Sequence, residues 1–268
     1  MTNSVTILIL TGPSGSGKTT LTESLAQTIS QDDETNGHHV TTCILHQDDY
    51  FTQPFIPYEE RTDASYEDDS GIDYQTLRDH ILFQIQQLPR QEERPDTDLV
   101  ILVEGHLVNA QKLRLHSIPH ISDNDGNTTI DTTCIHIQSI VLKCSQQSCT
   151  QRRLDRKSNR TQKEYQALEQ YMEQYVWPTY LSVGLSSIQS LEEYCKQYNT
   201  HNEMVMVPAH GGSGGEEDHE TDNGMTISTR RRSVKLHLLM KVDSVQLNLQ
   251  ECVEVIYHAW KNLFLSQE

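Results

Sequence analysis

Long apolar segments are missing from this chain of 268 residues. No run of apolar residues approaches the ~20 that a helix needs to cross a bilayer. No Lys or Arg comes before Lys18, so no basic segment precedes the apolar residues 5–10, as it would in a secretory signal peptide. These absences predict a protein with no signal peptide and no membrane partner.

Basic residues are scarce. The chain carries 21 Lys and Arg against 38 Asp and Glu, which gives a formal net charge of −17. Such a composition argues against nucleic acid or an anionic membrane as a partner, because both bind through clusters of positive charge. An anionic nucleotide must therefore be bound by a local device, for which backbone N–H groups and one Lys suffice.

Paired cysteines are missing as well. The six cysteines are scattered, with no C-x-x-C pair and no His at zinc-finger spacing. We therefore expect reduced thiols and a reducing compartment, the cytoplasm, with the nucleus as the alternative.

Hydrophobic residues make up 35% of the sequence, which is low for a compact fold of this length. Polar loops that dilute an ordinary core would explain the low value. One of them, at about 209–226, is rich in Gly, Asp and Glu, and we expect it to be disordered. We expect one domain over 1–268 that carries this acidic insert and a helical lid at about 145–175.

The strongest motif is the octet from Gly12 to Thr19, which fits the phosphate-binding pattern G-x-x-x-x-G-K-[ST] without a mismatch. Residues 5–10 before it are typical of a strand, and the apolar spacing after it is typical of a helix. In this context the loop N–H groups would hold ATP, with Lys18 reaching the β/γ-phosphates. We expect ATP to be bound by Gly12, Ser14, Gly15, Ser16, Gly17, Lys18, Thr19 and Thr20.

The rest of the chain alternates between strand and helix patterns, which predicts a three-layer α/β P-loop fold with a central, mostly parallel sheet of about five strands. The sequence offers two positions for the last parallel strand, 203–207 and 234–241, and does not decide between them. The other strands are expected at 40–46, at 99–103 and at 135–144, and the helices after 19, at 76–88, in 145–183 and at 245–264.

Acidic residues follow two of these strands, and strand ends meet at one edge of a parallel sheet. Glu104 is placed to complete a Mg²⁺ site with the Thr19 hydroxyl. Asp48 or Asp49 could orient an acceptor hydroxyl and take its proton. A hydrolase would hold a water there instead, so the motif alone does not separate a kinase from an NTPase.

Two further segments favour phosphoryl transfer to a nucleoside. The region after Asp49 could stack on a base and bind ribose through Tyr50, Phe51, Tyr66, Glu67, Asp68 and Asp73. Arg152, Arg153 and Arg156 lie at helical spacing in an otherwise acidic chain, and they could hold a phosphoryl group from a lid.

Five segments in order, "GPSGSGKTTL", "HQDDYF", "LVEGH", "CTQRRLDR" and "YVWPTYL", resemble the nicotinamide riboside kinases of the uridine-kinase-like P-loop family. The resemblance covers about residues 5–183 and the terminal helix. It implies ATP and Mg²⁺ as cofactors and a product such as nicotinamide mononucleotide. The altered segment "YEDDSGID" leaves Glu67 or Asp68 as the ribose-binding residue.

By this resemblance, Asp48 and Lys18 are catalytic, Thr19 and Glu104 hold the metal, and the three lid arginines bind ATP. The implied substrate-binding residues are Asp48, Phe51, Tyr66, Glu67, Asp68, Arg153 and Trp177. The alternatives are a uridine/cytidine kinase, or a P-loop NTPase or nucleotide-sensing scaffold without kinase activity. Neither base specificity nor the choice between monomer and weak dimer follows from these motifs.

Overall fold

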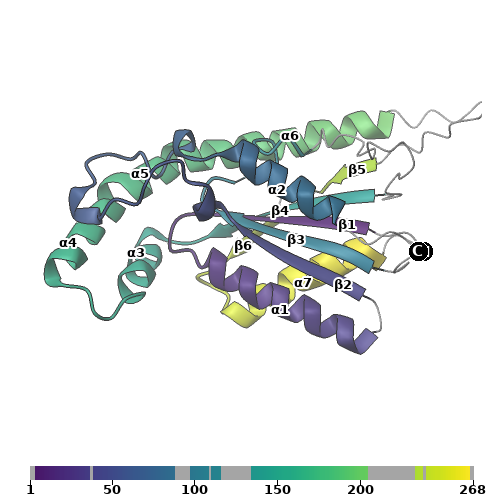
Figure 1. The fold of residues 1–268 in the computed structure, drawn as a ribbon, viewed down its shortest axis with the longest axis horizontal. Coiled ribbons are helices and arrows are strands. Elements are labelled where there is room, and N and C mark those ends of the chain that lie inside the picture. Colours follow the sequence, from purple (N-terminus) through teal and green to yellow (C-terminus); the bar gives the residue numbers. More distant parts are fainter. Residues whose placement is uncertain are drawn as a thin grey trace, which may run out of the picture.

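The computed structural model describes residues 4–36, 39–87, 97–108, 110–115, 134–204, 233–237 and 240–265. A central sheet lies between two layers of helices (Figure 1), and all the strand pairings described within it are parallel. The predicted three-layer α/β fold is thereby confirmed. Its strands are β1 (Ser4–Thr11), β2 (His39–His46), β3 (Thr97–Gly105), β4 (Cys134–Lys143), β5 (Ser233–Leu236) and β6 (Met240–Asp243).

The strand order is β2-β3-β1-β4-β5, and β6 also pairs with β4. β5 pairs with the first half of β4 and β6 with its second half, so together they form one interrupted edge strand. The last parallel strand therefore matches the 234–241 alternative. The other alternative, 203–207, is wrong at its start, because residues 203 and 204 belong to a helix.

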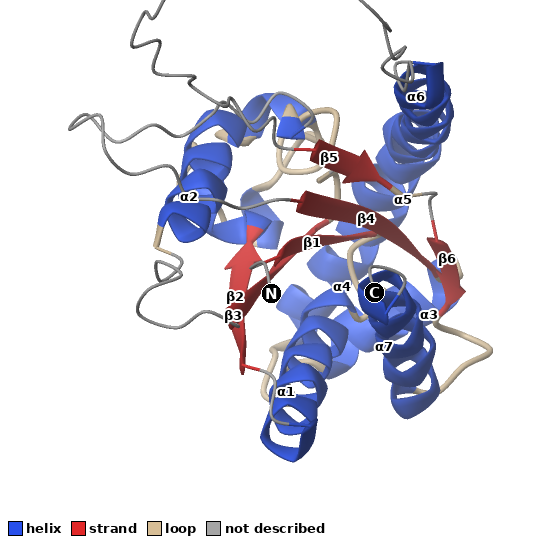
Figure 2. Ribbon diagram, turned by 90° about the vertical axis from the view of Figure 1, so that its right-hand side faces the viewer, coloured by secondary structure: helices blue, strands red, loops and turns tan. Residues whose placement is uncertain are grey.

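Two pairs of helices cover the sheet (Figures 1 and 2). α1 and α7 lie on one face, and α2 and α6 on the other. The helices are α1 (Lys18–Asn36), α2 (Tyr74–Gln86), α3 (Gln146–Asp155), α4 (Gln162–Tyr171), α5 (Trp177–Thr179), α6 (Leu185–Met204) and α7 (Leu249–Leu265).

β1 shows why the strands carry almost uninterrupted apolar runs. Ile7 and Ile9 pack into the core beneath α2 and α6, while Leu8 and Leu10 pack into the core against α1 and α7. All four side chains are fully buried, because a central parallel strand has a helical layer on each face. Each contributes about 1.5–3 kcal/mol by leaving water, so the sheet is a rigid base for the loops at its carboxyl end.

Beyond the carboxyl ends of the strands lies a separate group of helices, α3, α4 and α5, seen at the left of Figure 1. Ser145 caps α3, and Thr161 forms a capping box with Glu164 at the start of α4. From α4 the chain stays helical to the end of α6, with two π-helical turns, η5 (Met172–Val176) and η6 (Tyr180–Gly184). This agrees with the helical character predicted for 145–183.

Several other expectations have a clear outcome. The helix expected at 76–88 is α2, and the terminal helix expected at 245–264 is α7. Cysteine side chains are described at five positions, and all five are free thiols. No helix within the described ranges is long and apolar enough to cross a membrane. The acidic insert at 209–226 lies outside the described residues.

Candidate active site

The phosphate-binding loop connects β1 to α1. Gly12, Gly15 and Gly17 have φ angles of 155°, 87° and 97°, which side-chain-bearing residues rarely adopt. A Cβ on Gly15 would collide with the carbonyl oxygen of Cys149 in α3. Glycine at this position therefore serves both the turn and the close approach of α3 to the loop.

Lys18 is buried, with 7% of its surface exposed, and its ammonium group folds over the loop. Its Nζ donates to the carbonyl oxygens of Gly12 at 3.0 Å and Pro13 at 3.1 Å. Burial lowers the pKa of Lys18, and the charges of Glu104 and Asp48 oppose that shift. The hydroxyl of Ser16 is also buried and finds no hydrogen-bond partner among the described residues. Both groups can donate to phosphate oxygens.

Thr19 and Glu104 meet as predicted. The Thr19 hydroxyl donates to Glu104 Oε1 at 3.0 Å, and His46 Nδ1 lies 2.9 Å from the same oxygen. Glu104 is 5% exposed, so its carboxylate is held in a nearly fixed position. Within the described part of the chain, no group of three or more His, Cys, Asp and Glu could hold a metal. A hydroxyl and one carboxylate nevertheless fit Mg²⁺, which usually takes one or two protein oxygens together with water and substrate phosphates.

The structure separates the two candidates for the base. Asp48 and Asp49 both lie on the short helix η1 (Gln47–Tyr50) and are exposed. The charge of Asp48 acts on Lys18, whereas that of Asp49 acts on the Tyr50 phenol. Asp48 is therefore the candidate whose charge acts on the phosphate-binding loop.

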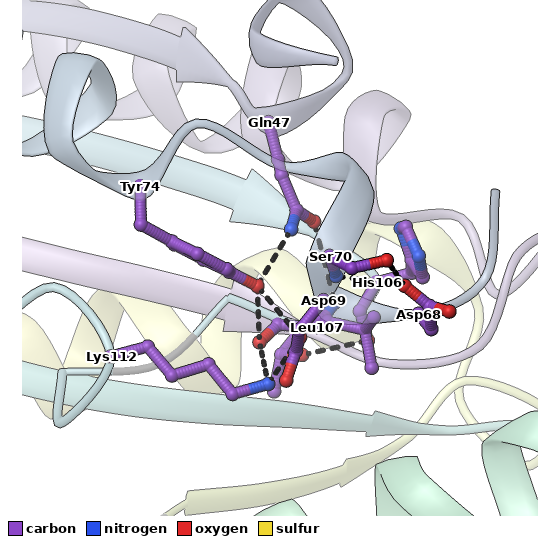
Figure 3. Close-up of polar contacts among 9 residues, drawn as sticks. Gln47, Asp68, Asp69, Ser70, Tyr74, His106, Leu107 and Lys112 are labelled. Carbon is purple, nitrogen blue, oxygen red and sulfur yellow. Dashed lines mark hydrogen bonds and ion pairs between the residues drawn. The ribbon is translucent and has the colours of Figure 1, made fainter. Parts of the chain in front are cut away.

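Gln47 fixes the position of this turn. Its buried side chain accepts from the Leu107 N–H at 3.3 Å and donates to the Tyr74 hydroxyl at 3.2 Å (Figure 3). The same hydroxyl donates to Asp69 Oδ1 at 3.0 Å, and Lys112 pairs with that oxygen at 2.6 Å. These bonds join η1, the loop before α2 and the segment after β3 on one side of the site.

A pocket of about 360 Å³ opens beside the phosphate-binding loop. Its size and position suit the base and sugar of a nucleotide whose phosphates lie on the loop. It is lined by Gly15, Ser16, Gly17, Thr20, Leu21, Leu142, Arg152, Arg156, Ser244, Leu247, Asn248, Leu249, and Cys252. The sequence interpretation missed the contribution of 244–252. A possible signal was the turn between the last strand and the last helix, which ends at the same edge of the sheet.

Arg152 bridges the two sides of this pocket. Its guanidinium donates to the Ser16 carbonyl at 3.1 Å and to the Ser244 carbonyl at 2.7 Å. It also donates to Cys144 Sγ at 3.6 Å. Arg156 lines the pocket as well, while Arg153 points the other way and donates to the Tyr58 hydroxyl. Of the three arginines predicted for the lid, Arg152 and Arg156 thus lie at the pocket and Arg153 on the other side, which we call the acceptor side because the sequence predicts the acceptor there.

The acceptor side is built around Glu67 and His106. Burial raises the pKa of Glu67 to about 7, although a hydrogen bond from Tyr171 at 3.1 Å and the charge of Arg153 act against the shift. His106 stacks on Phe51, with ring centroids 6.1 Å apart, and burial beside the Lys18 charge lowers its pKa. A small hollow joins this region to the phosphate-binding loop, and it is lined by Pro13, Ser14, Glu67, His106, Leu107, Val176 and Tyr180.

The remaining predicted substrate residues have different surroundings. Asp68 caps the short helix η3 (Asp69–Gly71), and its carboxylate accepts from the Ser70 N–H at 2.7 Å (Figure 3). Tyr66 packs on Phe51 at 5.7 Å, close to Glu67 in the chain. Trp177 packs on Tyr180 at 5.3 Å. Of the two candidates for the ribose, Glu67 lies by the phosphate-binding loop, while Asp68 is engaged in a turn.

Comparison with known proteins gives weak similarities. A gluconokinase from Sinorhizobium meliloti 1021 aligns over 97% of this chain and 97% of its own, with 13% identity and a TM-score of 0.37. A deoxyadenosine kinase from M. mycoides aligns over 96% and 99%, with 14% identity and a TM-score of 0.27. No family model and no curated protein matches the chain. Function must therefore be argued from the site.

Proposed function

We propose that this protein is an ATP-dependent kinase that phosphorylates the 5′-hydroxyl of a ribonucleoside, and that its substrate is nicotinamide riboside. The observation that carries the proposal is the position of Glu67. This half-buried carboxyl shares one hollow with Pro13 and Ser14 of the phosphate-binding loop and accepts a hydrogen bond from Tyr171. This hollow is only about 10 Å³, so it must widen to admit a ribose, and a ribose beside Glu67 would then present its hydroxyl to a phosphate on the loop.

The chain's own groups suit phosphoryl transfer. Asp48 would hold the 5′-hydroxyl in line with the γ-phosphate and accept its proton late in the reaction, since the transition state is loose. Lys18 would leave the carbonyls of Gly12 and Pro13 for the phosphate oxygens, where its charge is worth more because the site is buried. Arg153, which reaches from α3 to the acceptor side, could neutralise charge on the transferred group.

Thr19 and Glu104 would hold Mg²⁺, which supplies charge neutralisation for the β- and γ-phosphates. His46 contacts the same Glu104 oxygen and keeps that carboxylate oriented. Arg152 and the pocket wall around Ser244 would hold the nucleoside part of ATP.

Nicotinamide is favoured over a pyrimidine because the acceptor side is aromatic and acidic. Tyr58 and Tyr171 pack together at 5.3 Å, and Tyr171 also contacts Glu67. The base of nicotinamide riboside is a pyridinium cation, which ring faces and a carboxylate attract. A neutral uracil or cytosine would gain only stacking.

The test is ADP release with ATP alone and with ATP plus nicotinamide riboside, uridine or cytidine. We expect turnover with nicotinamide riboside at the highest kcat/KM, and none above background with ATP alone. Lys18→Ala is the matched control and should lose several orders of magnitude in rate while keeping its fold, because its ammonium contacts only loop carbonyls.

Two outcomes would replace the proposal. A higher kcat/KM for uridine or cytidine would make the protein a pyrimidine nucleoside kinase at the same site. ADP release that needs no acceptor, or nucleotide binding without any turnover, would indicate an NTPase or a nucleotide-sensing scaffold.

A further inference from the structure

Arg61 lies inside a box of four aromatic rings. Its guanidinium carbon is 4.0 Å from the ring centroid of Tyr66, 4.4 Å from that of Tyr58, 4.9 Å from that of Tyr171 and 5.2 Å from that of Phe55. A cation within about 6 Å of one ring face already gains from the ring quadrupole. Four rings around one guanidinium are far more than are needed to hold a single arginine at the surface. We call these four rings the aromatic box.

The box stands at the acceptor side of the site. Tyr58 accepts a hydrogen bond from Arg153, whose helix packs on the phosphate-binding loop. Tyr171 donates to Glu67 at 3.1 Å. The charges of Arg61 and Lys18 both act on Glu67, so the guanidinium in the box and the ammonium on the loop are both near one carboxyl. A nucleoside with its ribose at Glu67 would extend its base toward the box.

Bonds other than those to Arg61 hold the walls of the box in place. The Tyr66 hydroxyl donates to the Pro54 carbonyl, and the Tyr175 hydroxyl of the α4–η5 run donates to the Thr62 carbonyl at 2.8 Å. Tyr58 and Tyr171 also pack directly on each other. Arg61 itself donates from its Nε to the Ile56 carbonyl at 2.8 Å, and its side chain also hydrogen-bonds to the Tyr171 hydroxyl. The rings therefore have supports of their own that would remain if the guanidinium were displaced.

We propose that Arg61 is a resident occupant of the aromatic box and that any base must displace it to enter. The guanidinium is flat and cationic, so it makes the same ring contacts that a flat cationic base would make. A base can bind only in the fraction of molecules whose Arg61 has left, which weakens its apparent affinity by that fraction. A pyridinium recovers the lost cation–ring attraction, whereas a neutral pyrimidine does not. Arg61 would then weaken the binding of every base by the same factor, so that only a base to which the rings bind strongly, such as a pyridinium, is held tightly enough to replace it.

This inference rests on the proposed function for the identity of the natural base, but its test does not. The probes are 1-methylnicotinamide, a flat cation, and nicotinamide, its neutral counterpart. Their dissociation constants are measured by quenching of intrinsic fluorescence in the wild type, Arg61→Gln and Arg61→Lys, without ATP. Thermal melting confirms that each variant is folded.

With Arg61→Gln we expect both probes to bind about tenfold more tightly, which corresponds to removing a competing interaction of about 1.4 kcal/mol. The neutral probe is the decisive one, because the loss of a positive charge alone would tighten only the cation. Arg61→Lys keeps the positive charge but lacks the planar guanidinium. The dissociation constants of both probes for this variant should therefore lie between those for the wild type and for Arg61→Gln. The wild type should prefer the cationic probe.

Weaker or unchanged binding of the neutral probe to Arg61→Gln would overturn the proposal and make Arg61 a structural or substrate-holding residue. Should Arg61→Gln fail to fold, tighter binding of nicotinamide to Arg61→Lys than to the wild type supports the proposal, and its absence overturns it. In turnover with the true acceptor, KM should fall in Arg61→Gln while kcat is kept. A failure of the proposed kinase activity would leave the two binding constants unaffected, so the two ideas fail separately.

Discussion

The Thr19 hydroxyl donates a hydrogen bond to Glu104 Oε1 at 3.0 Å, although the two residues are 85 positions apart. β1 and β3 are neighbours in the sheet, with Thr11 opposite Gly105, so the start of α1 and the end of β3 reach the same point. His46, at the end of β2, contacts the same carboxylate oxygen. Adjacent parallel strands thus build this centre from three separate parts of the sequence.

Glu104→Gln should weaken the binding of Mg²⁺ at this centre. The amide keeps the size and one acceptor oxygen but loses the charge, so the Mg²⁺ concentration for half-maximal rate should rise about 10–100-fold. The measurement is ADP release over a Mg²⁺ titration. Thr19→Ser, which keeps the hydroxyl, is the control and should stay close to wild type. An unchanged Mg²⁺ requirement in Glu104→Gln would remove this residue from the metal site.

The fold followed from the sequence because its signals are local. Apolar runs such as residues 5–10 and 99–103 can be buried on both faces only in a covered parallel sheet, and the strands lie there. The sequence did not decide the position of the last parallel strand, because the apolar pattern of that strand is interrupted. β5 and β6 are two short pieces against one β4, and neither is long enough to give a clear period.

The site was predictable only in part, for a physical reason. The motif at Lys18 and Thr19 carries its own geometry, because consecutive N–H groups bind phosphate. Arg61, His46 and Ser244 have no such local signature, and their roles arise from what the fold places beside them. A lone arginine in an acidic loop looks solvated until four rings from two segments surround it.

Asp48→Asn should lower kcat by about 100-fold or more, as expected for the loss of a general base, with little change in ATP affinity. ATP affinity should survive because Lys18 and the loop amides bind the phosphates independently of η1. Asp49→Asn is the matched control, since its charge acts on Tyr50 instead of Lys18. The measurement is kcat with a nucleotide Kd for both variants. A dead Asp49→Asn beside an active Asp48→Asn would reverse the assignment.

Glu67→Gln should change how stability depends on pH. Burial raises the Glu67 pKa from 4.5 to about 7, so between these values the folded state keeps a proton that the unfolded state has released. The free energy of unfolding of the wild type therefore falls as pH rises through this window. Gln carries no charge at any pH, so the variant should lack this loss and be more stable above pH 7 by on the order of 3 kcal/mol.

The two proteins should differ little near pH 4.5 and increasingly up to pH 8, as measured by urea unfolding at each pH. The groups facing Glu67 are Tyr171, Arg153, Arg61 and Lys18, and all four partly favour the charged carboxylate. A constant difference across the range would mean that their combined effect cancels the effect of burial.

Cys144 should be the thiol that iodoacetamide modifies first, and ATP should slow its modification. A hydrogen bond from Cys149 lowers the pKa of Cys144, and the Arg152 guanidinium adds to the effect. Burial raises the pKa of Cys43, which makes that half-buried thiol the internal control. Because the thiolate is the reactive form, Cys144 should react ~10-fold faster than Cys43 at pH 7.

The protection by ATP follows from Arg152, which touches Cys144 and also lines the pocket proposed for the nucleotide. A nucleotide in that pocket would restrict access from this side, so saturating ATP should cut the Cys144 rate severalfold and leave the Cys43 rate unchanged. Peptide mass spectrometry over a time course measures both rates, and Cys144→Ser confirms the assignment. Equal rates at the two thiols would contradict the lowered pKa. If ATP does not change the rate of Cys144 modification, the nucleotide binds outside the pocket between Arg152 and α7.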